Sequence, residues 1–336
     1  MNTAVRAPET ASPPVWRRLA PGLVLAALAV ALAEGIHTLA PMIPTLTAAV
    51  VLGVIAAHLP AVRSPATRPG LNVAAKRLMR VAIVLLGLQL SLSDVTSLGW
   101  TTVAIVLTVV AVTFAGTLWL GKRIGLPGDQ PLLVATGYSI CGASAIGAVS
   151  QVTGSKDKDI ADSVAVVTLC GTLAIAVLPL LHHPLGLTDA DFGRWAGASV
   201  HDVGQVVAAA QTAGPEALQQ AVLVKLLRVV LLAPLVAGVA LTIRRKEEAA
   251  HPPLVPLFVA GFLATITLRT TGLVPDEILT AAKTTQHLLL AAALFALGAS
   301  VHLPSLTRTG SRLAFLGLAS WIVIAGLSYI GIALTT

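Results

Sequence analysis

The sequence is poor in charge, in cysteine and in aromatic side chains. Only 11% of its 336 residues are charged and 56% are hydrophobic, whereas a soluble domain carries roughly 25% charged residues. This deficit excludes an ordinary water-soluble domain. The two cysteines, Cys141 and Cys170, both lie in apolar stretches, so no disulfide framework is expected. The P-loop and HExxH signatures are also missing, which argues against a primary pump and a zinc protease.

Long apolar runs occupy most of the chain instead. Most of them reach the ~20 residues that a helix needs to cross a hydrocarbon core of ~30 Å. The sequence therefore predicts an all-α polytopic membrane protein with about 11 transmembrane helices. The expected spans are 19–33, 44–59, 78–93, 98–120, 131–152, 160–181, 192–213, 217–243, 254–272, 278–302 and 313–334. Residues 1–18 are expected to form a disordered tail, followed by a single transmembrane domain at 19–336.

Basic residues are distributed unevenly between the two sides of these spans. If the N-terminus is cytoplasmic, 16 Lys and Arg residues fall on the inner side and four on the outer side. This distribution follows the positive-inside rule. It predicts a multi-pass protein of the cell (plasma) membrane with a cytoplasmic N-terminus. The net charge of +7 thus reports orientation in the bilayer, and no nucleic-acid partner is expected.

Two pairs of short stretches resemble each other at nearly the same separation. Residues 77–87 resemble residues 225–238, and CGASAI at 141–146 resembles LGASVH at 297–302. Each pair lies five spans apart, and because five is odd the paired spans run in opposite directions. The pattern predicts an inverted 5+5 repeat, about 44–182 and about 192–334, preceded by one N-terminal helix.

The stretch GYSICGASAIGAV at 137–149 is unusually small and polar for a membrane segment. Glycine inside a helix costs about 1 kcal/mol relative to alanine, so its use here calls for a reason. A discontinuous helix supplies one, because Gly142 permits the break and the free N–H groups attract an anion. Ser139 and Ser144 would add hydroxyl donors. The alternative is tight packing of small residues against a neighbouring helix.

The repeat predicts an inverted counterpart of this break at 296–302. Gly298 would take the place of Gly142, and Ser300 would take the place of Ser144. The fold would then contain two discontinuous helices that cross near the middle of the membrane.

Polar residues interrupt a second small-residue stretch, GASVHDVGQVVAAA at 197–210. His201 and Gln205 are four residues apart and share a helix face, so Gln205 is predicted to contact the substrate. Ionisable residues within a span are expensive and are often functional. His201 and Asp202 are therefore predicted to carry coupling protons. The alternative is that both are solvated near the cytoplasmic end of the span.

Lys225 and Arg228 are expected to lie deep in the span at 217–243. At 1.5 Å per residue they would be roughly 12 and 17 Å from its start, close to the midplane. Two cations at that depth call for carbonyls, carboxylates or an anionic substrate. We expect at least one of them to bind the substrate. The alternative is a structural ion pair with Asp202 or Asp162.

Four motifs make the chain resemble the YeiH-type family of proposed sulfate exporters. They are GYSICGASAI (137–146), FGRWAGASVHDVGQVVAAA (192–210), KLLRVVLLAP (225–234) and KRLMRVAIVLLGLQLSL (76–92). The resemblance covers roughly 20–330. It implies an architecture similar to the cation:proton antiporter and bile-acid:sodium symporter group, with a panel domain and a core domain that holds crossed broken helices.

The sequence favours a secondary active transporter that exports a small inorganic or organosulfur anion, of the sulfate, sulfite or sulfonate class. The expected partners are this anion, a coupling proton or cation, and the lipid bilayer. No metal or other cofactor is expected, and a homodimer is left open. One alternative is a sodium- or proton-coupled importer of an organic anion, and another is a channel. A remote alternative is an intramembrane hydrolase that uses Ser139 or Ser144 with His201, although His201 and Asp202 point about 100° apart on one helix.

Overall fold

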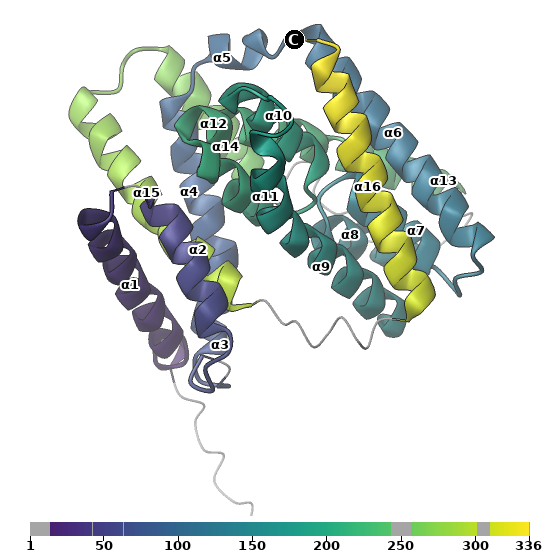
Figure 1. The fold of residues 1–336 in the computed structure, drawn as a ribbon, viewed down its shortest axis with the longest axis horizontal. Coiled ribbons are helices and arrows are strands. Elements are labelled where there is room, and N and C mark those ends of the chain that lie inside the picture. The colour runs from purple at the N-terminus through teal and green to yellow at the C-terminus, as the bar shows by residue number, and fades with distance from the viewer. Residues whose placement is uncertain (1–13, 42, 63, 243–256, 301–309, 336) are drawn as a thin grey trace, which may run out of the picture.

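The computed structural model describes residues 14–41, 43–62, 64–242, 257–300 and 310–335. Every regular element in these ranges is helical (Figure 1). In chain order they are α1 (Val15–Leu39), α2 (Thr45–Ala56), α3 (Arg68–Val73), η1 (Ala74–Leu78), α4 (Met79–Leu86), η2 (Gly87–Gln89), α5 (Leu92–Ser97), α6 (Gly99–Arg123), α7 (Gln130–Ser139), α8 (Ala143–Thr153), α9 (Asp157–His182), α10 (Asp189–Ser199), α11 (Val203–Ala210), η3 (Gln211–Ala213), α12 (Pro215–Val230), α13 (Leu232–Thr242), α14 (Leu257–Thr270), α15 (Asp276–Ala299) and α16 (Ser311–Ala333).

The length and composition of the helices confirm an all-α, multi-pass membrane protein. Six apolar helices in the described ranges are long enough to cross a membrane: Val15–Leu39, Gly99–Arg123, Asp157–His182, Pro215–Val239, Asp276–Ala299 and Ser311–Ala333. The predicted boundary of the N-terminal tail at residue 18 is wrong, because α1 begins at Val15. The earlier part of that tail, 1–13, lies outside the described residues.

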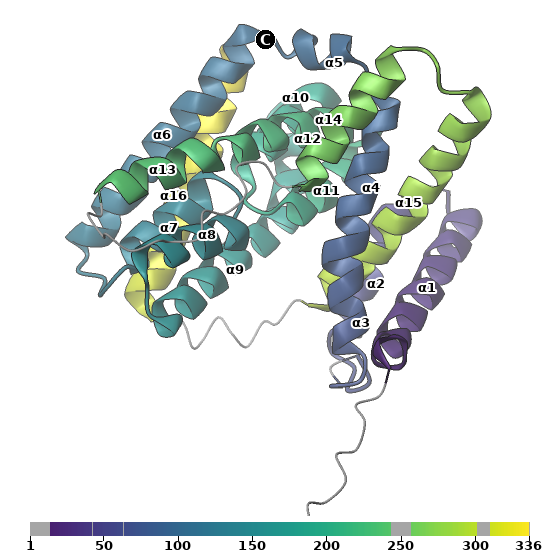
Figure 2. The same ribbon diagram turned by 180° about the vertical axis from the view of Figure 1, so that it is seen from behind.

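The helices form two bundles (Figure 1). The small bundle consists of α1, α2, the continuous rod from α3 to η2, α14 and α15. The hairpin bundle consists of α6 to α13 and α16 (Figure 2). We call the side where α1 begins the N face and the side where α16 ends the C face; these are the lower and upper sides of Figure 1.

The small bundle depends on a close approach of α2 and α15. A Cβ on Gly53 would lie 2.2 Å from the Phe295 carbonyl oxygen, and one on Gly298 would lie 2.5 Å from the Val50 carbonyl oxygen. Only glycine fits at such a crossing. The predicted break at 296–302 is therefore wrong over its described part, because α15 runs unbroken to Ala299. Residues 301 and 302 lie outside the described residues.

Alanine at Gly298 is expected to destabilise the protein by about 1–3 kcal/mol, because the added methyl group overpacks the contact with α2. Alanine at Gly35 is the matched control, since that glycine lies within α1 and a Cβ added there would meet no atom of a neighbouring element within 4 Å. There, alanine should stabilise by up to about 1 kcal/mol through helix propensity. Thermal unfolding of the two purified variants measures the difference. Equal stability would contradict the packing role of Gly298.

Helices α7 and α8 form a helical hairpin, which we call hairpin A. Its two ends meet at the N face, where Ser155 Oγ donates to Asp129 Oδ2 at 2.7 Å and the Gln130 amide donates to Asp162 Oδ2 at 3.3 Å. A Cβ on Gly137 would lie 2.9 Å from Cδ1 of Ile146. In a straight helix those residues would be about 13 Å apart along the axis. The chain therefore turns back at its tip.

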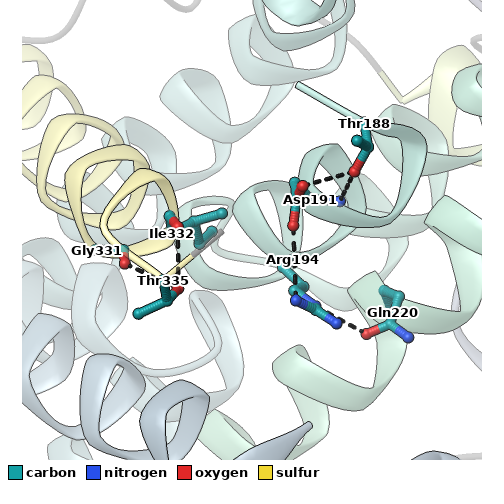
Figure 3. A network of polar contacts seen from close by, with 7 residues as sticks. All are labelled: Thr188, Asp191, Arg194, Gln220, Gly331, Ile332 and Thr335. Carbon is teal, nitrogen blue, oxygen red and sulfur yellow. Dashed lines mark hydrogen bonds and ion pairs between the residues drawn. The ribbon is translucent and has the colours of Figure 1, made fainter. Parts of the chain in front are cut away.

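Helices α10 and α11 with η3 form hairpin B, which starts from the C face. Figure 3 shows the polar network that ties its base to α12: Arg194 Nε donates to Gln220 Oε1 at 3.2 Å, and Arg194 pairs with Asp191 at 3.6 Å. Thr188 caps α10 by accepting from the N–H of Asp191. The Arg194–Gln220 bond places the start of α12 beside the start of α10. Because α12 begins directly after η3, α11 must return to the face from which α10 started.

The predicted crossings at 131–152 and 192–213 are therefore wrong, because each segment returns to its own face. Hydrophobicity could not reveal this, since a buried hairpin and a transmembrane helix are equally apolar. The first arm of hairpin A has 10 residues and that of hairpin B has 11, or about 15 Å each. Two such arms that meet end to end span ~30 Å, the thickness of a hydrocarbon core. We therefore expect the tips to meet near the middle of the membrane.

Candidate substrate site at the hairpin tips

A short irregular segment forms each hairpin tip. Hairpin A turns at residues 140–142, where Gly142 has φ of 68° and ends the tip as the N-cap of α8. This left-handed conformation favours glycine. Hairpin B turns at residues 200–202, and Asp202 is the N-cap of α11. A Cβ on Gly142 would lie 3.8 Å from the nitrogen of Asp202, so the two tips are in contact.

Lys225 joins the two tips. Its Nζ donates to the carbonyl oxygen of Ile140 at 2.6 Å and to that of Val200 at 2.9 Å. Each acceptor follows the last residue of the first arm of its hairpin. The side chain is fully buried, so the ammonium group is held between the carbonyl ends of α7 and α10.

Arg228 lies one turn further along α12 and binds the same two helix ends. Its guanidinium makes six contacts with backbone oxygens at 2.6–3.3 Å, and the residue is fully buried. The acceptors are Tyr138 and Ser139 on α7, and Gly197, Ala198 and Val200 on α10 or just after it. The planar fork of arginine suits this arrangement, since Nε and both terminal nitrogens donate.

Neither cation has a carboxylate partner within the part of the chain that the structure describes. The alternative of an ion pair with Asp202 or Asp162 is not observed there, since Asp202 accepts from Gly204 N–H at 2.8 Å and Asp162 accepts from Gln130. The expectation of a direct contact between a cation and the substrate also changes. Every nitrogen of Arg228 already donates to a backbone oxygen, so this side chain is committed to the hairpins.

His201 lies at the tip of hairpin B and is fully buried. Its ring meets that of Tyr138 edge-on, with centroids 4.2 Å apart. Within the described residues, neither ring nitrogen has a hydrogen-bond partner of normal geometry. A buried imidazole without a partner is costly, and such exceptions occur at functional sites.

Asp202 and Gln205 form a capping box at the start of α11. The Asp202 side chain accepts from backbone N–H, and the Gln205 side chain reaches back to the N–H of Asp202 at 3.4 Å. Gln205 Nε2 also donates to the Thr168 carbonyl at 3.1 Å, which fixes hairpin B to α9. Asp202 remains partly exposed, whereas Gln205 is buried. Gln205 thus has a clear structural role in this arrangement.

The three predicted serines lie in different environments. Ser139 is buried in α7, and its hydroxyl donates to the Thr136 carbonyl at 3.2 Å. Ser144 is exposed in the first turn of α8, directly after the hairpin tip. Ser300 follows the end of α15 and donates to Leu297, so the structure does not place it in a second discontinuous helix.

Sequence reasoning missed the true partner of the break in hairpin A. Residues 137–140 read Gly-Tyr-Ser-Ile and residues 197–200 read Gly-Ala-Ser-Val. Both have the pattern Gly-x-Ser followed by a β-branched residue, and both end the first arm of a hairpin. The equivalent positions, Ile140 and Val200, supply the two acceptors of Lys225. The shared pattern was visible in the sequence, but only the contacts identify which Gly-Ala-Ser stretch is the partner.

Comparison with known proteins assigns the chain to a family of membrane proteins. The family model described as Conserved hypothetical protein 698 matches residues 19–317, and the chain belongs to this family. The match confirms the resemblance to YeiH-type proteins. No solved structure matches the chain.

Bacterial relatives match over most of their length. The chain is 39% identical to a UPF0324 membrane protein of Corynebacterium glutamicum, over 96% of this chain and 94% of the relative. It is 36% identical to a UPF0324 membrane protein of Brucella melitensis, over 79% and 75% of the two chains. It is 34% identical to one of Agrobacterium fabrum, over 80% and 77%. The relatives' names establish a membrane protein and specify no substrate.

Proposed function

We propose that the protein is a secondary active transporter that exports a small inorganic or organosulfur anion. The observation that carries the proposal is the meeting of two opposed hairpins at a pair of buried cations, Lys225 and Arg228. Discontinuous helices that end inside a membrane protein are typical of substrate sites in carriers. Transport by such a site needs no covalent chemistry, so the proposal makes the protein a carrier and not an enzyme.

The charge balance at the tips favours an anion. Two helix C-termini contribute about −0.5 each and two helix N-termini about +0.5 each, so the four ends sum to zero. Lys225 and Arg228 then add two positive charges, and Asp202 removes one. The junction keeps a net charge of about +1, which favours an anionic substrate. Ser144 and the free N–H groups of the first turn of α8 are the proposed substrate contacts.

The proposed topology has nine crossing segments and the two hairpins, with the N face in the cytoplasm. In the described ranges the N face carries eleven basic residues and the C face three. If both hairpins crossed the membrane, the basic residues would be divided less unevenly between the two faces, so the positive-inside rule favours hairpins that return to their own face. The eleven are Arg17, Arg18, Arg68, Lys76, Arg77, Arg80, Lys122, Arg123, Lys156, Lys158 and Arg312, and the three are Arg194, Arg269 and Lys283.

In the proposed topology, the two halves of the inverted repeat are hairpin A with α9 and hairpin B with α12. We place the protein in the plasma membrane.

A cavity between the two bundles supports alternating access. It has a volume of about 560 Å³ and lies towards the C face, between the base of hairpin B and the small bundle. Gln211 and Pro215 line it from the hairpin bundle, and Glu34, Gln286 and Lys283 from the small bundle. Motion of one bundle against the other would open and close this cavity.

The proposal is tested by flux into proteoliposomes with sulfate, sulfite and small sulfonates under imposed pH and sodium gradients. We expect uptake of at least one of these anions that saturates with concentration and stops when the tips are disrupted. Flux into liposomes with the purified protein should exceed flux into empty liposomes by at least about tenfold. Absence of flux for every anion, with correctly inserted protein, would contradict the proposal.

His201 and Asp202 are proposed to carry the coupling proton, because both lie at the tips and, within the described residues, the ring nitrogens of the buried His201 have no hydrogen-bond partner of normal geometry. In His201→Gln and Asp202→Asn, anion exchange should persist while stimulation by a pH gradient is lost. Lys158→Gln is the control, since that residue is exposed at the base of hairpin A. Full pH stimulation in both variants would exclude these residues from coupling.

A further inference from the structure

We propose that Lys225 and Arg228 occupy, as tethered cations, the place of mobile metal cations at the hairpin tips, so that the transport cycle binds neither Na⁺ nor K⁺ there. This inference rests on the proposed transport function for its consequence in the cycle. Its structural part rests on the contacts alone. The paired tips require cations, and the side chains of this protein supply them.

The paired tips form a cation site by their backbone geometry. The last carbonyls of a helix have no partner within the helix, and each C-terminus carries a partial negative charge of about −0.5. In hairpins A and B two such ends, α7 and α10, meet inside the protein. Carbonyl oxygens at helix ends and in unwound backbone are the ligands that carriers use for Na⁺, and rings of backbone carbonyls bind K⁺ in channel filters. Without a cation the two ends would repel each other and leave buried acceptors unpaired.

The side chains of α12 already fill this site. Lys225 Nζ bridges Ile140 and Val200, one oxygen from each hairpin, at 2.6 and 2.9 Å. Arg228 takes the preceding carbonyls of both arms, from Tyr138 and Ser139 on one side and Ala198 on the other. Both residues are fully buried. The spacing of three residues on one helix face brings both cations to the junction.

The consequence for transport concerns the coupling ion. A mobile cation bound at the tips would enter and leave with the substrate, and its gradient would drive transport. A tethered cation remains bound in every step of the transport cycle, so a gradient of Na⁺ or K⁺ cannot drive transport through this site. The driving ion must then be a proton or a second anion. This reasoning removes the sodium-coupled alternative for this site.

The first test uses the wild-type protein. Its thermal unfolding temperature is measured in choline chloride, sodium chloride and potassium chloride at equal ionic strength, and anion flux is measured with each salt at fixed pH and membrane potential. The expected result is no shift in unfolding temperature beyond that of the ionic strength, and flux within twofold in all three salts. Flux that requires Na⁺ or K⁺, or specific stabilisation by either ion, would overturn the inference.

The second test removes the tethered ammonium with Lys225→Ala, which leaves the Ile140 oxygen without its Lys225 donor and the Val200 oxygen with Arg228 as its donor. The variant should unfold at a lower temperature in choline chloride and recover by about 5 °C or more with propylammonium chloride, which replaces the deleted group. The control Lys122→Ala removes an exposed lysine and should show no such recovery. If Lys225→Ala is as stable as wild type, or if no cation restores it, the inference fails.

A variant that does not fold leaves the first test intact, and Lys225→Arg then supplies the second. It keeps a tethered cation and should remain indifferent to Na⁺ and K⁺. The two proposals fail separately. If propylammonium restores the stability of Lys225→Ala and the wild type shows no anion flux, transport is refuted and the tethered site is kept. Sodium-dependent flux in the wild type would support transport and refute the tethered site.

Discussion

Replacement of Arg228 by glutamine is expected to destabilise the protein by about 3–5 kcal/mol and to abolish transport. The guanidinium makes six contacts of 2.6–3.3 Å with backbone oxygens of both hairpins, and hydrogen bonds to a charged group contribute about 1.5–3 kcal/mol each. Glutamine has two N–H donors and no charge. Several oxygens would remain buried without a partner, which is the usual source of such large losses.

The measurement is thermal or denaturant unfolding of purified protein, together with anion flux. Arg228→Lys is the matched variant, because it keeps the charge and loses the planar fork. It should fall between wild type and Arg228→Gln in stability, since an ammonium group reaches fewer of the five oxygens that accept from Arg228. Lys122→Gln removes an exposed charge and should change stability by no more than about 0.5 kcal/mol. Wild-type stability in Arg228→Gln would contradict the role assigned to this residue.

Cysteine at Lys158 is expected to be labelled only from the face that also labels cysteine at Lys122. Both residues are exposed, and Lys158 follows hairpin A near its base at the N face. A membrane-crossing segment at 131–152 would place the two residues on opposite sides. The variants are made in a protein that carries Cys141→Ala and Cys170→Ala, because the two native cysteines are free thiols that could also react with the label.

An impermeant maleimide applied to sealed right-side-out and inside-out vesicles gives the answer. Cysteine at Glu216, exposed near the start of α12 at the C face, marks the opposite side. We expect positions 158 and 122 to react in the same vesicles and position 216 in the others. Reaction of 158 together with 216 would show that hairpin A crosses the membrane and would remove the basis of the opposed-hairpin site. The test does not depend on which face is cytoplasmic.

The sequence alone determined the class of the protein and the burial of two of its charged residues. Scarce charge and long apolar runs require a multi-pass helical membrane protein, because a helix of about 20 apolar residues crosses the hydrocarbon core and satisfies its own backbone there. The small polar stretch at 137–149 predicted a break at Gly142, and α8 begins directly after this residue, although α7 and α8 form a hairpin and not the crossing helix that was expected. Lys225 and Arg228 were identified as deeply buried because charge within an apolar span is expensive, and the structure confirms that burial.

Only the tertiary structure decided what these residues contact. Hydropathy measures whether a segment is apolar and not whether it returns to its own face, so it predicts a membrane crossing for each of the two hairpins. Gly298 lies in a Gly-Ala-Ser stretch like that after Cys141, yet it packs against α2 in an unbroken helix. The partner of hairpin A was the other Gly-Ala-Ser stretch, at 197–199. The deciding fact was which buried carbonyls Lys225 and Arg228 could reach, and it depends on the packing of α12 between residues far apart in the chain.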